Sequence, residues 1–138
     1  MNLLVNIDVD NLERAIRFYT GAFDLKVTRR FGSDAVELLG GSAPIYLLLK
    51  ATGTLATSAP SQTRDYGRHW TPVHLDIAVA NIEDAVSRAT AAGATQEQPV
   101  RSSSWGKLAL MADPFGHGFC LVQFVGRGYD EIARPEVP

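Results

Sequence analysis

The chain repeats itself at a spacing of 70 residues, and this repeat limits the folds that it can adopt. LVNIDVDNLERAI begins at Leu4, and HLDIAVANIEDAV begins at His74. The offset pairs five identical residues, Ile7 with Ile77, Val9 with Val79, Asn11 with Asn81, Glu13 with Glu83, and Ala15 with Ala85. Two copies of one supersecondary unit bury their apolar faces together. We therefore expect two related modules around a shared core.

Each copy begins with the pattern of a strand followed by a helix. Residues 4–9 alternate apolar and polar side chains, which is the period of a strand with one face on a core. Asn11 is placed to cap a helix, and the apolar stripe of that helix contains Leu12, Ala15, Ile16, Tyr19 and Phe23. Three further strands, LKVTRRF, AVELL and IYLLL, are separated by turn-forming residues at 32–34 and 40–42. The first module is therefore predicted to be βαβββ.

The same order of elements returns in the second half of the chain. Asn81 is a second helix cap, Gly93 a helix stop, and ATQEQPV, KLALMA and GFCLVQF the following strands. We expect one domain at 1–125, with module one at 3–51, a linker at 52–71 and module two at 72–125. The linker is rich in Thr, Ser, Gly and Ala and has no periodicity, which predicts a loop. Residues 126–138 are expected to be a loosely packed tail.

Charge and cysteine content exclude several classes of protein. The formal net charge is -2 and no basic stripe occurs, so a nucleic-acid partner is not expected. The longest apolar run, residues 45–49, is too short to span a bilayer, and no signal-like segment opens the chain, so we expect a cytoplasmic protein that does not enter membranes. Cys120 is the only cysteine, which excludes an internal disulfide and a multi-thiolate zinc site within one chain.

The repeated βαβββ units resemble the vicinal oxygen chelate superfamily, which includes glyoxalase I, extradiol dioxygenases, and fosfomycin- and bleomycin-resistance proteins. The resemblance covers residues 3–125 and depends on NLERAIRFYTGAFDL, NIEDAVSRATAAGA and MADPFGHGFCLVQF, in that order. It implies an α+β fold in which two βαβββ modules form a curved mixed sheet, with the helices on the outer face. It also implies that the paired sheets form a cup, and that this cup holds the functional site.

In the metal-using members, the resemblance implies four ligands from the first and last strands of the two modules. The first-module position is Leu4, which has no donor atom, and its counterpart is His74. Counting seven residues on from Asp113 places Cys120 where the family usually has glutamate, and the strand PIYLLLK offers neither carboxylate nor imidazole. A catalytic zinc normally needs three protein ligands. We therefore expect no metal and no other cofactor, unless Asp76, Asn6 or Asp8 contributes to a rebuilt site.

The predicted ligand-binding residues are Asn6, Asp8, His74, Asp76, Trp105 and Cys120, and His74 is the candidate catalytic residue. Each of these side chains could instead have a purely structural role. His74 could simply contact Asp76 or the backbone, Cys120 could be a small core residue, and Trp105 could cap the core. The three acidic and amide side chains could be exposed edge positions. Arg64, Arg68 and Lys107 could pair with an anionic ligand or remain solvated.

Three classes of function are compatible with these residues. The leading interpretation is a metal-independent protein that binds a small organic molecule in the cup, because ligands of the family metal site are missing. The alternative is an enzyme, namely a glyoxalase-like lyase or isomerase or a dioxygenase-like enzyme, with His74 as base or within a rebuilt metal site. A non-catalytic interaction module is the third. A homodimer is expected because the sheets leave edges to be covered.

Overall fold

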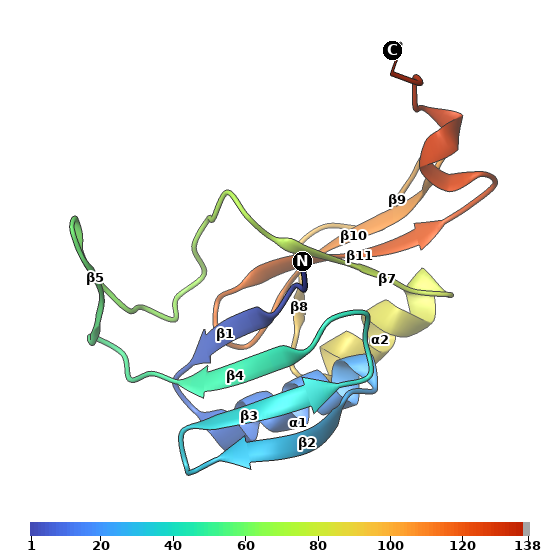
Figure 1. The fold of residues 1–138 in the computed structure, drawn as a ribbon. Coiled ribbons are helices and arrows are strands. Elements are labelled where there is room, and N and C mark those ends of the chain that lie inside the picture. Colours follow the sequence, from blue (N-terminus) through green and yellow to red (C-terminus); the bar gives the residue numbers. More distant parts are fainter. Residues whose placement is uncertain (137–138) are drawn as a thin grey trace.

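The computed structural model describes residues 1–136, and it confirms two βαβββ modules (Figure 1). The first module contains β1 (Val5–Val9), α1 (Leu12–Phe23), β2 (Lys26–Phe31), β3 (Ala35–Leu39) and β4 (Ile45–Leu49). The second contains β7 (Leu75–Ala78), α2 (Ile82–Ala92), β8 (Thr95–Gln96), β9 (Arg101–Ser102), β10 (Gly106–Ala112) and β11 (Gly118–Phe124). The two short strands β8 and β9 both pair with β10 and replace the single strand predicted over ATQEQPV.

Both helices begin at the predicted caps. The Asn11 side chain accepts a hydrogen bond from the backbone N–H of Arg14, and Asn81 does the same for Asp84. Each bond satisfies one of the N–H groups that the first turn leaves without a helical partner. Gly93 ends α2 at a φ of 122°, a left-handed conformation that glycine adopts without a steric penalty.

The two modules have the same sheet topology. The first sheet has the order β1-β4-β3-β2, and the path of the second is β7-β11-β10-β8. In each sheet the first strand is parallel to the last strand of its module, with Asn6 opposite Tyr46 and Asp76 opposite Cys120. The internal repeat pairs Asn6 with Asp76, so Tyr46 and Cys120 occupy equivalent positions in the two modules.

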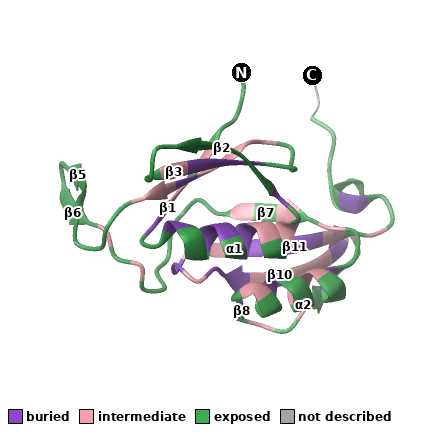
Figure 2. Ribbon diagram, turned by 90° about the horizontal axis from the view of Figure 1, so that it is seen from below, coloured by how far each residue is buried: buried purple, intermediate pink, exposed green. Residues whose placement is uncertain are grey.

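The shared core lies on the helix side of the sheets. Figure 2 shows α1 between the layer of the first sheet and the strands β10 and β11 of the second, with α2 beyond them. The Phe18 and Phe23 rings of α1 pack edge-on against Phe119 of β11, with ring centroids 6.4 and 5.5 Å apart. The phenol of Tyr19 is buried and donates a hydrogen bond of 2.5 Å to Asp113. Helix α1 therefore joins the two modules.

The linker and the tail contain more structure than the sequence predicted. Two short strands, β5 (Leu55–Ser58) and β6 (Ser61–Thr63), form an exposed hairpin within the linker. In the tail a 3-10 turn, η1 (Gly128–Glu131), places the ring of Tyr129 against Trp105. The last two residues of the expected tail, 137–138, lie outside the described residues. Within residues 1–136, no helix has the length and apolar character needed to cross a membrane.

Candidate functional site

A narrow slot separates β1 from β7, the first strands of the two modules. Its volume is about 290 Å³, close to the lower end of the range for small-molecule sites. Apolar side chains form most of its walls, namely Val5, Ile7, Phe23, Val73, Leu75, Ile77 and Phe119. The polar residues that reach it are Asn6, Asp8, Tyr19, His69, Thr71, His74 and His117. The slot thus combines an apolar interior with polar groups that converge from both modules and from the linker.

His74, Asp76 and Cys120 form one cluster on the second module. The His74 Nε2 atom lies 3.1 Å from the Asp76 Oδ1 atom, and one potential ligand atom from each of the three residues lies within 4.8 Å of the others. His74 and Asp76 are exposed, whereas Cys120 is buried beneath them. Burial, with a smaller contribution from the Asp76 charge, raises the pKa of the Cys120 thiol to about 11. The thiol is therefore protonated at neutral pH.

The first module offers no comparable set of donors at the equivalent positions. Leu4 is exposed and has no ligand atom. The sheet register shows that Tyr46 is the counterpart of Cys120, and its hydroxyl donates a hydrogen bond of 2.7 Å to Glu37. That bond is the main cause of the raised pKa of Tyr46, so its phenol also stays protonated. Leu4 has no donor atom and the Tyr46 hydroxyl is bonded to Glu37, so these two positions do not reproduce the four-ligand arrangement of the family.

Asp8, a predicted site residue, is held by the linker and by the second module. The Arg64 side chain donates a hydrogen bond of 2.8 Å to the Asp8 carboxylate, and Arg64 also donates to the Leu55 carbonyl. The His117 Nε2 atom lies 2.7 Å from the Asp8 carbonyl oxygen, so this nitrogen is the protonated one and donates. These contacts position one wall of the slot.

Two histidines of the slot lining, His69 and His117, are not among the predicted ligand-binding residues. Their rings lie 5.9 Å apart, and the His69 Nδ1 atom lies 2.8 Å from the Gly67 carbonyl oxygen. His117 directly follows the turn at residues 113–116, which precedes the last strand. Its position in the sequence does not indicate a contact with the first strand, so only the folded arrangement shows that His117 reaches β1.

The other predicted residues have different outcomes. Trp105 packs in an aromatic cluster with Phe124 and Tyr129, at centroid distances of 6.3 and 5.0 Å, and does not belong to the slot lining within the described residues. The three basic side chains considered for an anionic ligand all form ion pairs inside the chain. Their partners are Asp8 for Arg64, Glu97 for Arg68 and Glu83 for Lys107.

Comparisons with known proteins agree with this architecture. Residues 4–122 match the family model of the glyoxalase-like domain, so the chain belongs to that family and to the vicinal oxygen chelate superfamily. An uncharacterized protein of Mycobacterium bovis is 30% identical over 129 residues, which cover 90% of this chain and 84% of that protein.

Solved structures share the fold at low sequence identity. A glyoxalase/bleomycin resistance/dioxygenase family enzyme from Burkholderia phytofirmans aligns with a TM-score of 0.67 and 20% identity, over 88% of this chain and 97% of that chain. A mutant of the fosfomycin resistance protein FosX from Listeria monocytogenes, complexed with Mn(II) and a dihydroxypropylphosphonic acid, aligns with a TM-score of 0.66 and 17% identity. That match covers 88% of this chain and 87% of the FosX chain.

Proposed function

We propose that this protein binds a small organic molecule in the slot between β1 and β7, without a metal ion. The observation that carries the proposal is the slot itself, with apolar walls and convergent polar side chains from Asn6, Asp8 and His74. Such a lining favours a flat, largely apolar ligand whose few polar atoms meet fixed partners. Leu4 and Tyr46, at two of the four positions that hold metal in the family, support the metal-independent form of this proposal.

The proposal also covers the oligomeric state, the location and the binding partners of the protein. We expect a cytoplasmic homodimer that binds neither nucleic acid nor membranes. The small net negative charge supports the absence of a nucleic-acid partner. The free edges of β1 and β7 support dimerisation, because each of these strands pairs on one side only within the described residues.

Tryptophan fluorescence can test ligand binding. Trp70 lies between two slot residues, His69 and Thr71, and its side chain is exposed. A flat aromatic compound that enters the slot is expected to quench Trp70, and Trp70→Phe should abolish the signal while Trp105→Phe retains it. A panel of flat aromatic compounds, each titrated against these proteins, provides the measurement.

The first prediction concerns His74→Ala. This change should weaken binding of the quenching compound by about 1 to 2 kcal/mol, the scale of one lost hydrogen bond with its contact area. The melting temperature should stay nearly unchanged, because His74 is exposed. If His74→Ala instead lowers the melting temperature strongly, and the protein that remains folded binds every compound with wild-type affinity, His74 has a structural role only.

A second candidate function follows from the close approach of His74, Asp76 and Cys120. Three donors within 4.8 Å meet the number of protein ligands that a catalytic zinc needs. The His74–Asp76 contact also supports a lyase or isomerase in which the carboxylate orients His74 as the base. Metal binding would require loss of the Cys120 proton, which its raised pKa opposes.

Elemental analysis separates the two candidates. Protein purified without chelator should contain no stoichiometric transition metal under the first proposal, and nickel, zinc or manganese should not raise its melting temperature. One ion per chain, lost in both His74→Ala and Cys120→Ser, would replace the first proposal with the second.

A further inference from the structure

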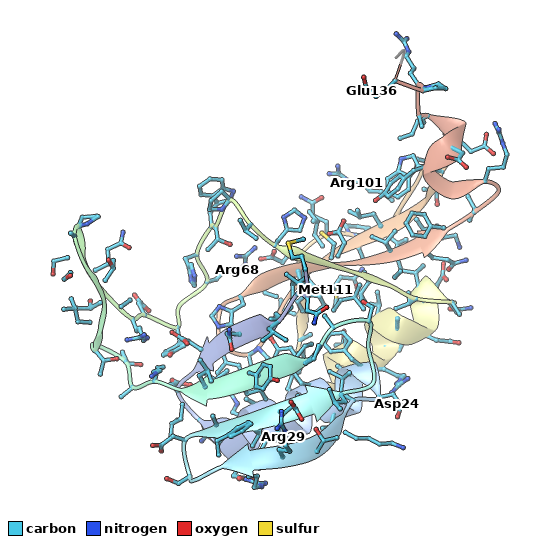
Figure 3. The ribbon with its side chains drawn as sticks, viewed as in Figure 1. Asp24, Arg29, Arg68, Arg101, Met111 and Glu136 are labelled. Atoms are coloured by element: carbon cyan, nitrogen blue, oxygen red, sulfur yellow. The ribbon has the colours of Figure 1, made fainter. Side chains whose placement is uncertain are left out.

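A row of polar side chains crosses the first sheet on the face turned away from α1. Asn6, Tyr46, Glu37 and Arg29 stand opposite one another on neighbouring strands. Arg30, the next residue of β2, points to the other face, where it pairs with Glu13 of α1. Figure 3 shows Arg29 in front of the sheet, on the side opposite to α1.

Glu37 is the centre of this row and is fully engaged. Its side chain is only 7% exposed, although the sheet face is open. The carboxylate accepts hydrogen bonds from Thr28 Oγ1 at 2.9 Å, Tyr46 OH at 2.7 Å, and Arg29 Nε and Nη2 at 2.9 and 2.5 Å. The bond from Arg29, followed by that from Tyr46, lowers the pKa of Glu37 to about 2. Glu37 is therefore a fixed anion that positions Arg29 and Tyr46.

Arg29 has donors left over. Glu37 uses Nε and Nη2, so the edge that carries Nη1 faces solvent, and the side chain is 61% exposed. Its guanidinium lies 5.4 Å from the centroid of the Phe31 ring, and the Phe31 ring lies 6.2 Å from that of Tyr46. A guanidinium in a fixed plane beside the exposed Phe31 ring and the half-buried Tyr46 ring matches a ligand that is both flat and acidic.

The neighbouring pair of Arg30 and Glu13 shows what an ordinary surface ion pair looks like in this strand. Arg30 donates one hydrogen bond, and both side chains are half-exposed. Such pairs contribute little to stability. The bidentate, buried-carboxylate arrangement around Arg29 restricts the guanidinium far more, which is the property that recognition of a carboxylate needs.

We propose that Arg29, Phe31 and Tyr46 form a subsite for a planar organic anion, an aromatic or conjugated carboxylate. The carboxylate meets the free edge of Arg29, and the ring of the ligand lies against Phe31. This inference rests on the proposed binding of a small molecule by the protein. The subsite lies outside the slot lining and adjoins it at Asn6, which pairs with Tyr46, so it takes the acidic end of that ligand. Because Glu37 offsets part of the charge of Arg29, the overall affinity is modest, and the preference for a carboxylate over a neutral group comes from charge-assisted hydrogen bonds to the free N–H groups of Arg29.

The probe for this subsite is 2-naphthoate, compared with the neutral 2-naphthamide, in a two-dimensional NMR titration of isotope-labelled protein. We expect naphthoate to shift the amide signals of residues 28–31, 37 and 46, and naphthamide to bind at least tenfold more weakly. Arg29→Gln should reduce the affinity for naphthoate at least tenfold. The matched control Arg30→Gln, on the opposite face of the same strand, should change it less than twofold.

A second variant, Phe31→Leu, tests the subsite independently in case Arg29→Gln does not fold. Phe31→Leu keeps the ion pair of Arg29 with Glu37 and should weaken naphthoate binding severalfold. Equal binding by wild type, Arg29→Gln and Phe31→Leu would overturn the inference, as would the absence of any shift at millimolar naphthoate. Shifts confined to residues 5–8, 69–77 and 117–119 would also overturn it, but would leave the proposed slot in place.

Discussion

Cys120 lies beneath the contact of His74 with Asp76, and its chemistry depends on burial. The thiol has a pKa of about 11, raised first by desolvation and then by the negative charge of Asp76. The thiolate is the nucleophilic form of cysteine. A group with this pKa is about one-thousandth ionised at pH 8. Cys120 therefore packs beneath His74 and Asp76 as a neutral thiol and is not a nucleophile; like Asp76, it does not belong to the slot lining that residues 1–136 form.

Alkylation rates can check this assignment. We expect iodoacetamide to label Cys120 slowly at pH 8 in the folded protein and rapidly in guanidinium, with the folded rate still rising as the pH approaches 11. Asp76→Asn should accelerate labelling of the folded protein, because it removes a charge that raises the pKa. Labelling of the native protein at the rate of a free thiol would show that Cys120 is a reactive thiolate.

At this scale the sequence predicted part of the site. His74 and its counterpart Leu4 followed from the internal repeat, and Asn6 and Asp8 from the alternation along one strand. Tyr46 could not be assigned, because the strand PIYLLLK allows two registers and only the pairing of Tyr46 with Asn6 selects one. The contact of Trp105 with Tyr129 was not foreseen for a similar reason, since Tyr129 lies in a segment without periodicity.

Among the elements, the linker contributes most to the site beyond what its sequence indicated. Residues 66–69 lie against the beginning of β11, and Figure 3 shows Arg68 near this strand. A Cβ atom at Gly118 would lie 2.6 Å from the Arg68 guanidinium, and one at Gly116 would collide with the Gly67 carbonyl oxygen. The two glycines thus allow the linker to approach and bring His69 to the slot.

Gly116→Ala should therefore destabilise the protein more than an ordinary turn mutation. Gly116 has a φ of 81°, so alanine meets both backbone strain and the Gly67 carbonyl. We expect a loss of at least about 2 kcal/mol in the free energy of unfolding, measured with urea. The control Gly32→Ala also has a positive φ but open space around it, and should cost only about 1 kcal/mol. Equal losses in the two variants would contradict close packing of the linker.

The sequence predicted elements where the controlling signals are local. The caps at Asn11 and Asn81 and the apolar stripe of each helix depend on residues within a few positions of one another. The sequence contains no such local signal for the break between β8 and β9 or for the hairpin of β5 and β6. The side chains of these strands are all exposed, so apolar and polar residues do not alternate along them. The conformation of β8 and β9 is determined by pairing with β10, and that of β5 and β6 by pairing with each other.

For the whole molecule, a buried polar contact adds to the aromatic packing at the junction of the two modules. The hydroxyl of Tyr19 in α1 donates to Asp113, whose other carboxylate oxygen accepts from the backbone N–H groups of Phe115 and His117. Burial, followed by the Asp113 charge, raises the pKa of Tyr19 well above its usual value. The neutral phenol therefore stabilises the fold below pH 10, and this contribution is lost as the pH rises toward the folded-state pKa.

Tyr19→Phe should lower the free energy of unfolding by about 1 to 3 kcal/mol, since it leaves a buried carboxylate oxygen without its donor. Tyr129→Phe is the matched control, because Tyr129 is exposed and should tolerate loss of its hydroxyl. Both variants can be measured by urea denaturation at pH 7. A loss in Tyr19→Phe no larger than in the control would mean that apolar packing alone joins the modules.

The last prediction concerns assembly. Large apolar side chains are exposed in the segments that lead into β1 and β7, namely Leu3, Leu4, Trp70 and Val73. Exposed apolar groups beside strands with a free edge favour association with a second copy. We expect sedimentation velocity to show a homodimer at tens of micromolar, and Leu4→Asp to convert it to a monomer. Leu55→Asp, at an equally exposed leucine of the β5–β6 hairpin, should leave the dimer intact. A wild-type protein that sediments only as a monomer would contradict the prediction and would confine the ligand site to a single chain.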